Sequence, residues 1–187
     1  MAKATDNVIL QGTHGTFAKQ VVIRQRFGQS ILSKRPTHVK GNPTPAQQVV
    51  RERFQTATLY AKSVMANPDL LAQYRAVAKN GQSAYNLALA DAFRAPEIRE
   101  IDALNYTGKT GSTIRIRAID DFRVRAVVVS VYSADNQLLE TGNAVQQNIG
   151  LDWIYTATQE HAPTTGAKIK VQASDLPGNV TLKEQVL

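Results

Sequence analysis

Apolar and polar residues alternate most regularly over residues 112–132. The segment opens with STIRIRA, whose period of two predicts a half-buried strand. A second run of β-branched residues follows, and the step from Val124 to Val127 breaks the alternation. This break predicts a β-bulge near Arg125–Ala126. Two adjacent strands of this kind predict antiparallel sheets that each have one buried face.

The alternation continues along the second half of the chain, where turn residues separate seven predicted strands. Seven short strands in this arrangement are typical of an Ig-like or fibronectin-III-like β-sandwich. Trp153 and Tyr155 lie on the same side of one strand, so we expect a large aromatic side chain to fill the core between the sheets. The predicted strands are residues 97–106, 113–119, 123–132, 137–142, 151–158, 167–174 and 179–186.

A helical period replaces the alternation after a Pro-rich connector at residues 35–45. Thr44 is the predicted N-cap, Pro45 fits the first helical position and Gln47 completes a capping box. The predicted helix runs to about Ala66. Its apolar stripe comprises Val50, Phe54, Ala57, Ala61 and Val64.

Two shorter helices are predicted from Pro68 to about Gly81 and from Ser83 through Phe93. The sequence Arg94–Pro96 then interrupts the pattern and marks a hinge. We therefore predict two domains, residues 1–96 and residues 97–187. The predicted class is α+β, with an N-terminal β-hairpin and a three-helix module before a seven-stranded antiparallel Ig-like sandwich.

Before the connector, the sequence predicts a short strand at Asn7–Leu10 and then a β-hairpin. The hairpin strands are residues 20–26 and 30–33, with a turn at Phe27–Gln29. The predicted hairpin has an apolar side and a basic side. An isolated two-stranded ribbon is marginally stable in water, so its apolar side must pack on helices of the same chain or of a neighbour.

Positive charge is concentrated in the first half of the chain. Residues 1–98 carry 13 Lys and Arg against 5 Asp and Glu, whereas residues 99–187 carry 9 against 10. Such asymmetry predicts an acidic or polyanionic partner for the first half. The predicted contact residues for assembly or for a polyanion are Val21, Ile23, Arg24, Arg26, Lys34, Arg35 and Lys40.

Composition excludes several classes of site. The chain has no cysteine, which rules out disulfides and thiolate chemistry. Its start has no signal-peptide pattern, and no run approaches the roughly 18 apolar residues of a membrane span. We therefore expect a protein of the cytoplasm, or of a particle assembled there, with no membrane partner.

No catalytic constellation is evident in the sequence. Gly108-Lys109-Thr110 imitates the end of a P-loop, but the leading glycine is missing and a strand follows where a helix is needed. The three histidines, at positions 14, 38 and 161, have no carboxylate at metal-ligand spacing. We predict a protein that is not an enzyme, with no cofactor, no metal and no small-molecule substrate.

The acidic turns of the second half are the remaining polar feature. Loops that emerge at one end of an Ig-type sandwich bring Asp120, Asp121, Asp175 and Asn179 together. Oxygen ligands from two loops could bind Ca²⁺, but no third acidic loop is apparent, so turn capping is the preferred interpretation. We predict that these residues form an inter-domain contact with the basic half.

The second half resembles the Ig and fibronectin-III-like modules that are common in bacterial and phage structural proteins. The resemblance rests on DDFRVRAVVVSVYSADNQLLETG, DWIYTA and ASDLPGN. The first half is similar to a group of uncharacterised bacterial and phage-type proteins, in which a Gly-rich start and a basic strand pair precede a PTPAQ helix. Here these features are residues 12–35, residues 43–47 and an R-x-x-F formed by Arg51 and Phe54.

These features favour a structural protein that self-assembles as a subunit of a phage-like particle, tail or filament. An N-terminal arm is a natural strand donor to a neighbouring copy, so a homo-oligomer is expected. The alternative is a nucleic-acid-binding protein of the nucleoid type, which would use the basic half for phosphates. An adhesion or carbohydrate-binding module is a third possibility, which the missing export signal disfavours.

Overall fold

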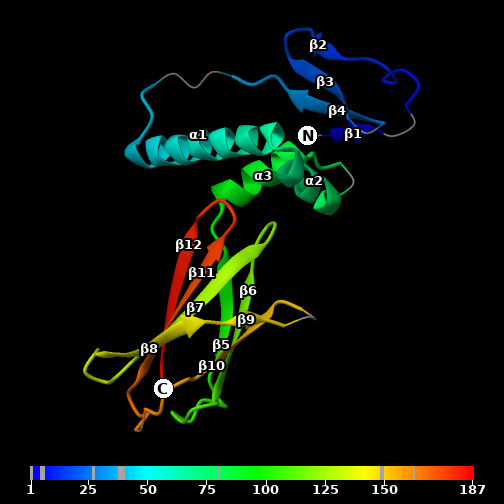
Figure 1. Cartoon of the computed structure of the whole chain (residues 1–187). Coiled ribbons are helices and arrows are strands. Elements are labelled where there is room, and N and C mark those ends of the chain that lie inside the picture. The colour runs from blue at the N-terminus through cyan, green and yellow to red at the C-terminus, as the bar shows by residue number, and fades with distance from the viewer. Residues whose placement is uncertain are drawn as a thin grey trace. The chain divides into compact units, whose positions relative to one another are not determined.

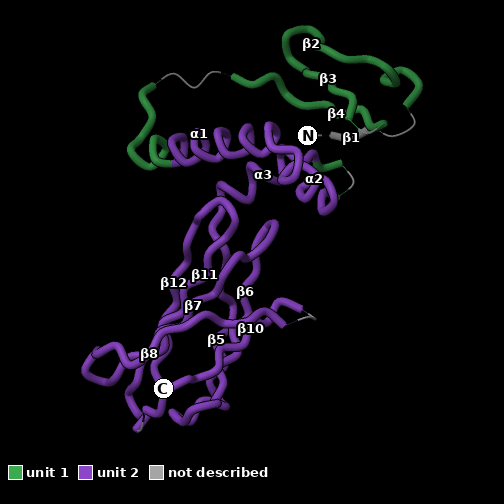
Figure 2. The backbone as a smooth tube through the Cα atoms, in the orientation of Figure 1, with its two compact units in different colours: residues 1–49, 79–82 green, residues 50–78, 83–187 purple. Residues whose placement is uncertain are grey.

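The computed structural model of the chain has an α+β fold (Figure 1). It describes residues 2–4, 7–26, 28–37, 41–79, 81–147, 150–161 and 163–187. The chain divides into two compact units (Figure 2). Unit 1 comprises residues 1–49 and 79–82, and unit 2 comprises residues 50–78 and 83–187.

Unit 1 contains a four-stranded antiparallel sheet in the order β1-β4-β3-β2. The predicted hairpin is confirmed as β3 and β4, and two strands of three residues extend it on either side. Local alternation predicts the long pair, whereas the short edge strands carry too few residues to show a period. The strands are β1 (Ala2–Ala4), β2 (Gly15–Phe17), β3 (Val21–Arg26) and β4 (Gln29–Lys34).

The predicted strand at Asn7–Leu10 is wrong, because this segment forms a turn. The backbone carbonyl of Asn7 accepts hydrogen bonds from the amides of Leu10 and Gln11. The Asn7 side chain also accepts a bond from the amide of Ile9, at 3.0 Å. An asparagine that bonds its own following backbone competes with strand pairing, and here it outweighs the apolar run.

The first and third helices begin and end close to the predicted positions, whereas the second ends at Val77, before the predicted end near Gly81. The capping box is confirmed, because the Gln47 amide donates to Thr44 Oγ1 at 3.3 Å and the Thr44 amide donates to Gln47 Oε1 at 3.1 Å. Asn67 and Ser83 cap the other two helices through their side-chain oxygens. The helices are α1 (Pro45–Ala66), α2 (Pro68–Val77) and α3 (Ala84–Phe93).

Only the second part of the α1 stripe is buried. Ala57, Ala61 and Val64 have no exposed surface, whereas Val50 and Phe54 are 52% and 51% exposed. Every residue of α1 before Ala57 is exposed. The first turns of this helix therefore present apolar side chains that the rest of unit 2 does not cover.

The second half forms two four-stranded antiparallel sheets, in the orders β5-β6-β10-β9 and β12-β11-β7-β8. Eight strands occur where seven are predicted, because the two-residue β9 adds to an edge. The strands are β5 (Glu97–Asp102), β6 (Thr113–Ile119), β7 (Val124–Tyr132), β8 (Leu138–Asn143), β9 (Val145–Gln146), β10 (Asp152–Thr156), β11 (Lys168–Asp175) and β12 (Val180–Val186).

The predicted bulge is confirmed in β7. Ser174 of β11 pairs with Ala126 and the next residue, Asp175, pairs with Val124, so Arg125 is the extra residue. A bulge bends its strand and redirects the side chains beside it. Here it lies opposite Asp175, the last residue of β11.

The buried faces of the two sheets form one hydrophobic core, an arrangement consistent with a β-sandwich. The predicted alternation is confirmed, since Ile114 and Ile116 are fully buried whereas Arg117 is exposed. Trp153 and Tyr155 both lie in this core, at 7% and 2% exposure. We call residues 97–187 the two-sheet region.

The helices pack on one end of the two-sheet region. Tyr74 and Leu87 belong to a second buried cluster, and Phe122 and Leu176 from two inter-strand loops pack against it. This packing places most of α1, all of α2 and all of α3 in unit 2, whereas the predicted boundary at residue 96 groups them with the hairpin. Whether residues 97–187 fold alone stays a prediction. No helix among the described residues is both long enough and apolar enough to cross a membrane.

Candidate functional site

The predicted contact residues for assembly or for a polyanion, which we call the N-terminal arm residues, belong to unit 1. Arg24 and Arg26 share one face of β3, and Val21 and Ile23 share the other, as alternation requires. Lys34 pairs directly with Val21, so it lies on the apolar side of the sheet and not beside the two arginines. The structure therefore separates the predicted basic residues between two faces.

The remaining predicted arm residues differ in their contacts and exposure. Arg26 donates a hydrogen bond to the carbonyl of Gly81 at 3.2 Å, which ties residues 79–82 to the sheet. Arg35 follows β4 and is exposed. Lys40, the last of the predicted contact residues, lies outside the described residues, as do Phe27 and His38.

The unit 1 sheet is held by a polar network at one end. The Gln25 amide donates to the carbonyls of Leu10 and Thr13 and to Ser30 Oγ, at 2.8–2.9 Å. Ser30 Oγ donates in turn to the Leu10 carbonyl at 3.0 Å. Ser30 is the one buried residue among the described residues of this unit. The sheet thus has ordered hydrogen bonds, and its described side chains form no apolar core of their own.

The acidic turns of the two-sheet region meet the end of α3. Asp121 forms an exposed ion pair with Arg94 at 3.0 Å. The Asn179 side-chain amide donates to the carbonyls of residues 91, 92 and 94, at 3.2–3.3 Å, and to Asp175 Oδ2 at 2.6 Å. Asn179 therefore satisfies carbonyls that the end of a helix leaves without intrahelical partners.

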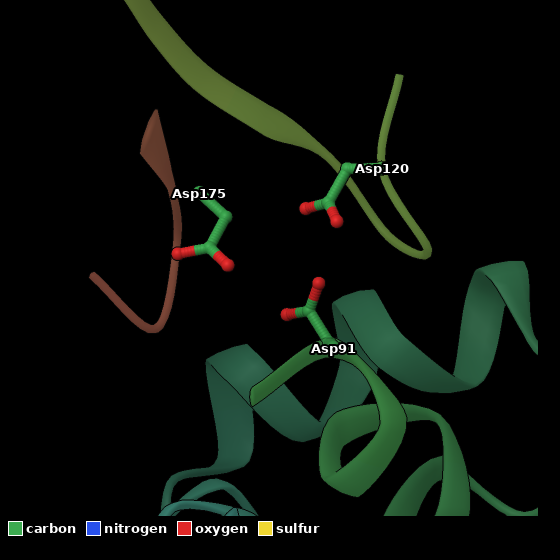
Figure 3. A group of neighbouring side chains, drawn as sticks. All are labelled: Asp91, Asp120 and Asp175. Atoms are coloured by element: carbon green, nitrogen blue, oxygen red, sulfur yellow. The ribbon is translucent and has the colours of Figure 1, made fainter. Parts of the chain in front are cut away.

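Asp120 and Asp175 are brought together with a third carboxylate, Asp91 of α3 (Figure 3). One oxygen from each residue lies within 4.8 Å of the other two. Asp91 and Asp175 have no exposed surface, and Asp120 is half-buried. We call these three residues the aspartate cluster. The sequence shows no third acidic loop, and the third carboxylate comes instead from a helix.

Sequence reasoning missed Asp91, although a signal for it exists. The sequence of α3 is AYNLALADAF, in which Asp91 is the only charged residue. A carboxylate in a helix that is otherwise almost entirely apolar is rarely buried without a specific partner. The partner here is Tyr74 of α2, whose hydroxyl donates to Asp91 Oδ2 at 2.5 Å.

A line of hydroxyl groups leads from the cluster into the helices. The Tyr60 and Tyr74 hydroxyls lie 3.0 Å apart, and the Tyr74 ring stacks on Phe122 with centroids 4.1 Å apart. Burial raises the pKa of Tyr74, so its hydroxyl keeps the proton that it donates to Asp91. The stacking joins α2 to the turn that carries Asp120.

Burial also governs the charge of the cluster. It raises the pKa of Asp91; the bond from Tyr74 opposes this shift, and the neighbouring Asp120 and Asp175 carboxylates reinforce it. Burial likewise raises the pKa of Asp120. The hydrogen bond from the backbone amide of Asp121 opposes this upward shift, and the negative charge of Asp175 adds to it. Buried carboxylates with raised pKa values need either protons or a cation.

The comparisons with known proteins give no family. No protein-family model matches the chain, and no curated protein matches it. Among solved structures, the chain is similar to the crystal structure of an engineered protein, at 15% identity and a TM-score of 0.35. The similarity covers 57% of this chain and 29% of that chain, and at this TM-score it carries no argument about fold or function.

Proposed function

We propose that the protein is a non-enzymatic structural subunit that self-assembles through its N-terminal arm, as part of a phage-like particle, tail or filament. The observation that carries the proposal is the missing core of unit 1. Among its described residues only Ser30 is buried, and Phe17, opposite Val21 on the apolar side, is 70% exposed. A sheet whose apolar face is not covered by its own unit needs a second layer to be stable.

A neighbouring copy of the chain is the partner that best fits this face. The three-residue strands β1 and β2 leave the outer edges of the sheet short, and longer strands of another copy can extend such edges. The two-sheet region also exposes apolar residues on its edge strand β12, namely Val180, Leu182 and Val186. Exposed apolar surface in both units supports assembly by contacts between copies.

We also propose that the two-sheet region is an Ig-like sandwich. If the strands are lettered along the chain in the Ig convention, the sheet β5-β6-β10-β9 has the order A-B-E-D. The neighbouring strands β12-β11-β7 of the other sheet then have the order G-F-C. β8 then takes the C′ position beside β7. This order supports a rigid spacer module, a role that suits a subunit of a larger structure but does not by itself define one.

Binding of nucleic acid is the second candidate, and the charge of unit 1 favours it. Unit 1 contains eight Lys and Arg residues and a single acidic residue, an Asp, which gives it a net charge of +7. This equals the net charge of the whole chain, so unit 2 is neutral overall. Arg24 and Arg35 are exposed and could contact phosphates. Against it, Phe17 is the one aromatic residue in the described part of unit 1, which offers little for base stacking.

The test compares two double variants of the full chain. Val21→Asp/Ile23→Asp places charge on the apolar face, and we expect it to abolish oligomers. Arg24→Ala/Arg35→Ala removes charge, and we expect it to weaken oligomers mildly and in a salt-dependent way. Arg26 is left unchanged because it holds Gly81. Light scattering at two concentrations and negative-stain microscopy provide the measurement.

A matched control keeps the test specific. Leu104→Asp makes the same kind of apolar-to-Asp change once, at a residue that is 91% exposed in the two-sheet region, and it should leave assembly unchanged. A monomeric wild-type chain at every concentration contradicts assembly. If that monomer binds DNA below micromolar at physiological salt, and the arginine pair reduces the salt slope by about two, nucleic-acid binding replaces it.

A further inference from the structure

Two oxygens of the aspartate cluster accept no hydrogen bond from a donor outside the cluster among the described residues. Asp91 Oδ1 is fully buried and accepts no hydrogen bond from the described residues, and the Asp91 carboxylate faces Asp120 and Asp175 (Figure 3). Asp120 Oδ2 is also buried and accepts none from them. A buried carboxylate oxygen without a hydrogen-bond partner is costly, and either a shared proton or a bound cation can offset that cost.

The remaining oxygens of the cluster are held in place by hydrogen bonds. Asp91 Oδ2 accepts from Tyr74, and Asp120 Oδ1 accepts from the Asp121 amide at 2.8 Å. Asp175 Oδ1 accepts from the amides of Gly178 and Asn179, at 2.8 and 2.6 Å. Each carboxylate is thus oriented by outer partners, as metal-ligating carboxylates are.

The cluster also lacks a compensating positive charge. No ion pair among the described residues includes Asp91, Asp120 or Asp175, and the nearby Arg94 pairs instead with Asp121. Three carboxylates that converge in a largely buried position repel one another strongly. A divalent cation would supply the missing charge and would ligate the two unsatisfied oxygens at the same time.

We propose that Asp91, Asp120 and Asp175 bind a divalent, oxygen-preferring cation, with Ca²⁺ as the best fit. Calcium lies about 2.3–2.6 Å from its oxygen ligands, so two ligands on opposite sides of the ion are roughly 5 Å apart. Magnesium, at about 2.0–2.1 Å, needs roughly 4 Å. One oxygen from each carboxylate lies within 4.8 Å of the other two, a spacing that admits either ion. Calcium is preferred because it accepts irregular coordination, whereas magnesium gives up its waters reluctantly, which a largely buried cluster disfavours. All three ligands are carboxylates, a donor set that does not favour zinc or copper.

A cation at this position would join three segments that are distant in sequence. Asp91 comes from α3, Asp120 from the β6–β7 turn and Asp175 from the end of β11. The ion therefore fastens the helices to the two-sheet region within unit 2. This is a structural role, and it is independent of whether the N-terminal arm assembles.

The test uses the full chain after treatment with EDTA and removal of the chelator. Titration calorimetry with CaCl2 should show one site per chain, with weaker binding of MgCl2. Saturating Ca²⁺, about 100 times Kd, should raise Tm by about 5–10 °C. Tb³⁺ provides a second readout on the unmutated chain, because Tyr74 bonds directly to Asp91 and can sensitise its emission, which excess Ca²⁺ should abolish.

Two variants give the matched comparison. Asp120→Asn changes the half-buried member of the cluster, which tolerates substitution best, and it should weaken Ca²⁺ binding about tenfold or more. Asp121→Asn removes the same charge one residue away, from a side chain paired with Arg94, and it should leave affinity within about threefold.

Two results overturn the proposal. One is a wild-type chain that takes up no Ca²⁺ or Mg²⁺ and has the same Tm in EDTA and in Ca²⁺. The other is an Asp120→Asn variant whose Tm rises equally in both conditions, which would mean that the carboxylates share protons and need no ion.

Discussion

The unit 1 sheet and the sheets of the two-sheet region are built from similar strands but differ in what covers them. Both use antiparallel pairs rich in β-branched residues, such as Val21 to Ile23 in β3 and Val127 to Val129 in β7. The second set is fully or partly buried beneath another sheet, whereas the first set is only half-buried. Strand pairing alone therefore defines a sheet, but only a second layer gives it a core.

The two regions also differ in charge. In the two-sheet region, Arg115 pairs with Asp102 and Glu100, and Arg117 pairs with Asp152, across neighbouring strands. In unit 1, no ion pair among the described residues includes Arg24. Charge is therefore balanced between neighbouring strands in the two-sheet region, whereas unit 1 carries an excess of positive charge.

The largest expected effect comes from a core truncation. Trp153→Ala should lower the free energy of unfolding by about 3–5 kcal/mol, because the indole fills the core between the two sheets. Leu32→Ala, in the half-buried sheet of unit 1, should cost less than about 1 kcal/mol. Urea unfolding, monitored by far-UV circular dichroism, measures both losses. Tryptophan fluorescence is unsuitable because Trp153→Ala removes the one tryptophan of the chain.

The same pair of variants can break the comparison. A loss below about 1 kcal/mol for Trp153→Ala would place the indole outside a packed core. A loss for Leu32→Ala that grows with protein concentration would mean that another copy covers this sheet, as the proposed assembly requires.

A smaller effect is expected from removing the helices. Residues 97–187 expressed alone should give a cooperative, β-rich unfolding transition, as the predicted boundary implies. This fragment should be about 2–3 kcal/mol less stable than residues 50–187, because Phe122 and Leu176 lose the helices that cover them. Denaturant unfolding of the two fragments under identical conditions measures the difference.

The outcome also distinguishes two views of the chain. A disordered far-UV spectrum from residues 97–187 would reject the predicted boundary and would make the helices part of the same folding unit. Equal stability of the two fragments would mean that the helices contribute nothing to the two-sheet region, despite their shared buried cluster.

The smallest effect concerns the exposed charges of the two-sheet region at low pH. The hydrogen bond from Arg115 lowers the pKa of Asp102, and that from Arg117 lowers the pKa of Asp152. A lowered folded-state pKa contributes stability above the unfolded value of about 3.9, and this contribution is lost as the pH falls through the folded pKa values. The destabilisation caused by Arg115→Ala should therefore be present at neutral pH and shrink in strong acid.

Salt provides the control for that experiment. Because the ion pairs are exposed, added salt at neutral pH should reduce the effect of Arg115→Ala. An effect that is the same in strong acid and at neutral pH would assign the role of Arg115 to packing of its aliphatic stem and not to its charge.

The sequence by itself determined the elements with strong local signals. The bounds of β6 and α1, the capping box at Thr44 and the bulge at Arg125 all follow from periodicity or from side chains a few residues apart. Such features depend on the nearest neighbours along the chain, which the sequence shows directly. The convergence of Asp120 with Asp175 followed from a further assumption, namely the order of strands in an Ig-type sandwich.

Tertiary structure alone decided what surrounds these elements. Asp91 joins Asp120 and Asp175 only because α3 packs on two loops that are 29 and 84 residues further along the chain. The incomplete burial of Val50 in α1 and of Val21 in β3 could likewise not be predicted from the sequence. Both residues belong to apolar periods like those of residues that the structure buries. Burial depends on which other element packs on an apolar face, and the periodicity of one helix or strand does not specify that element.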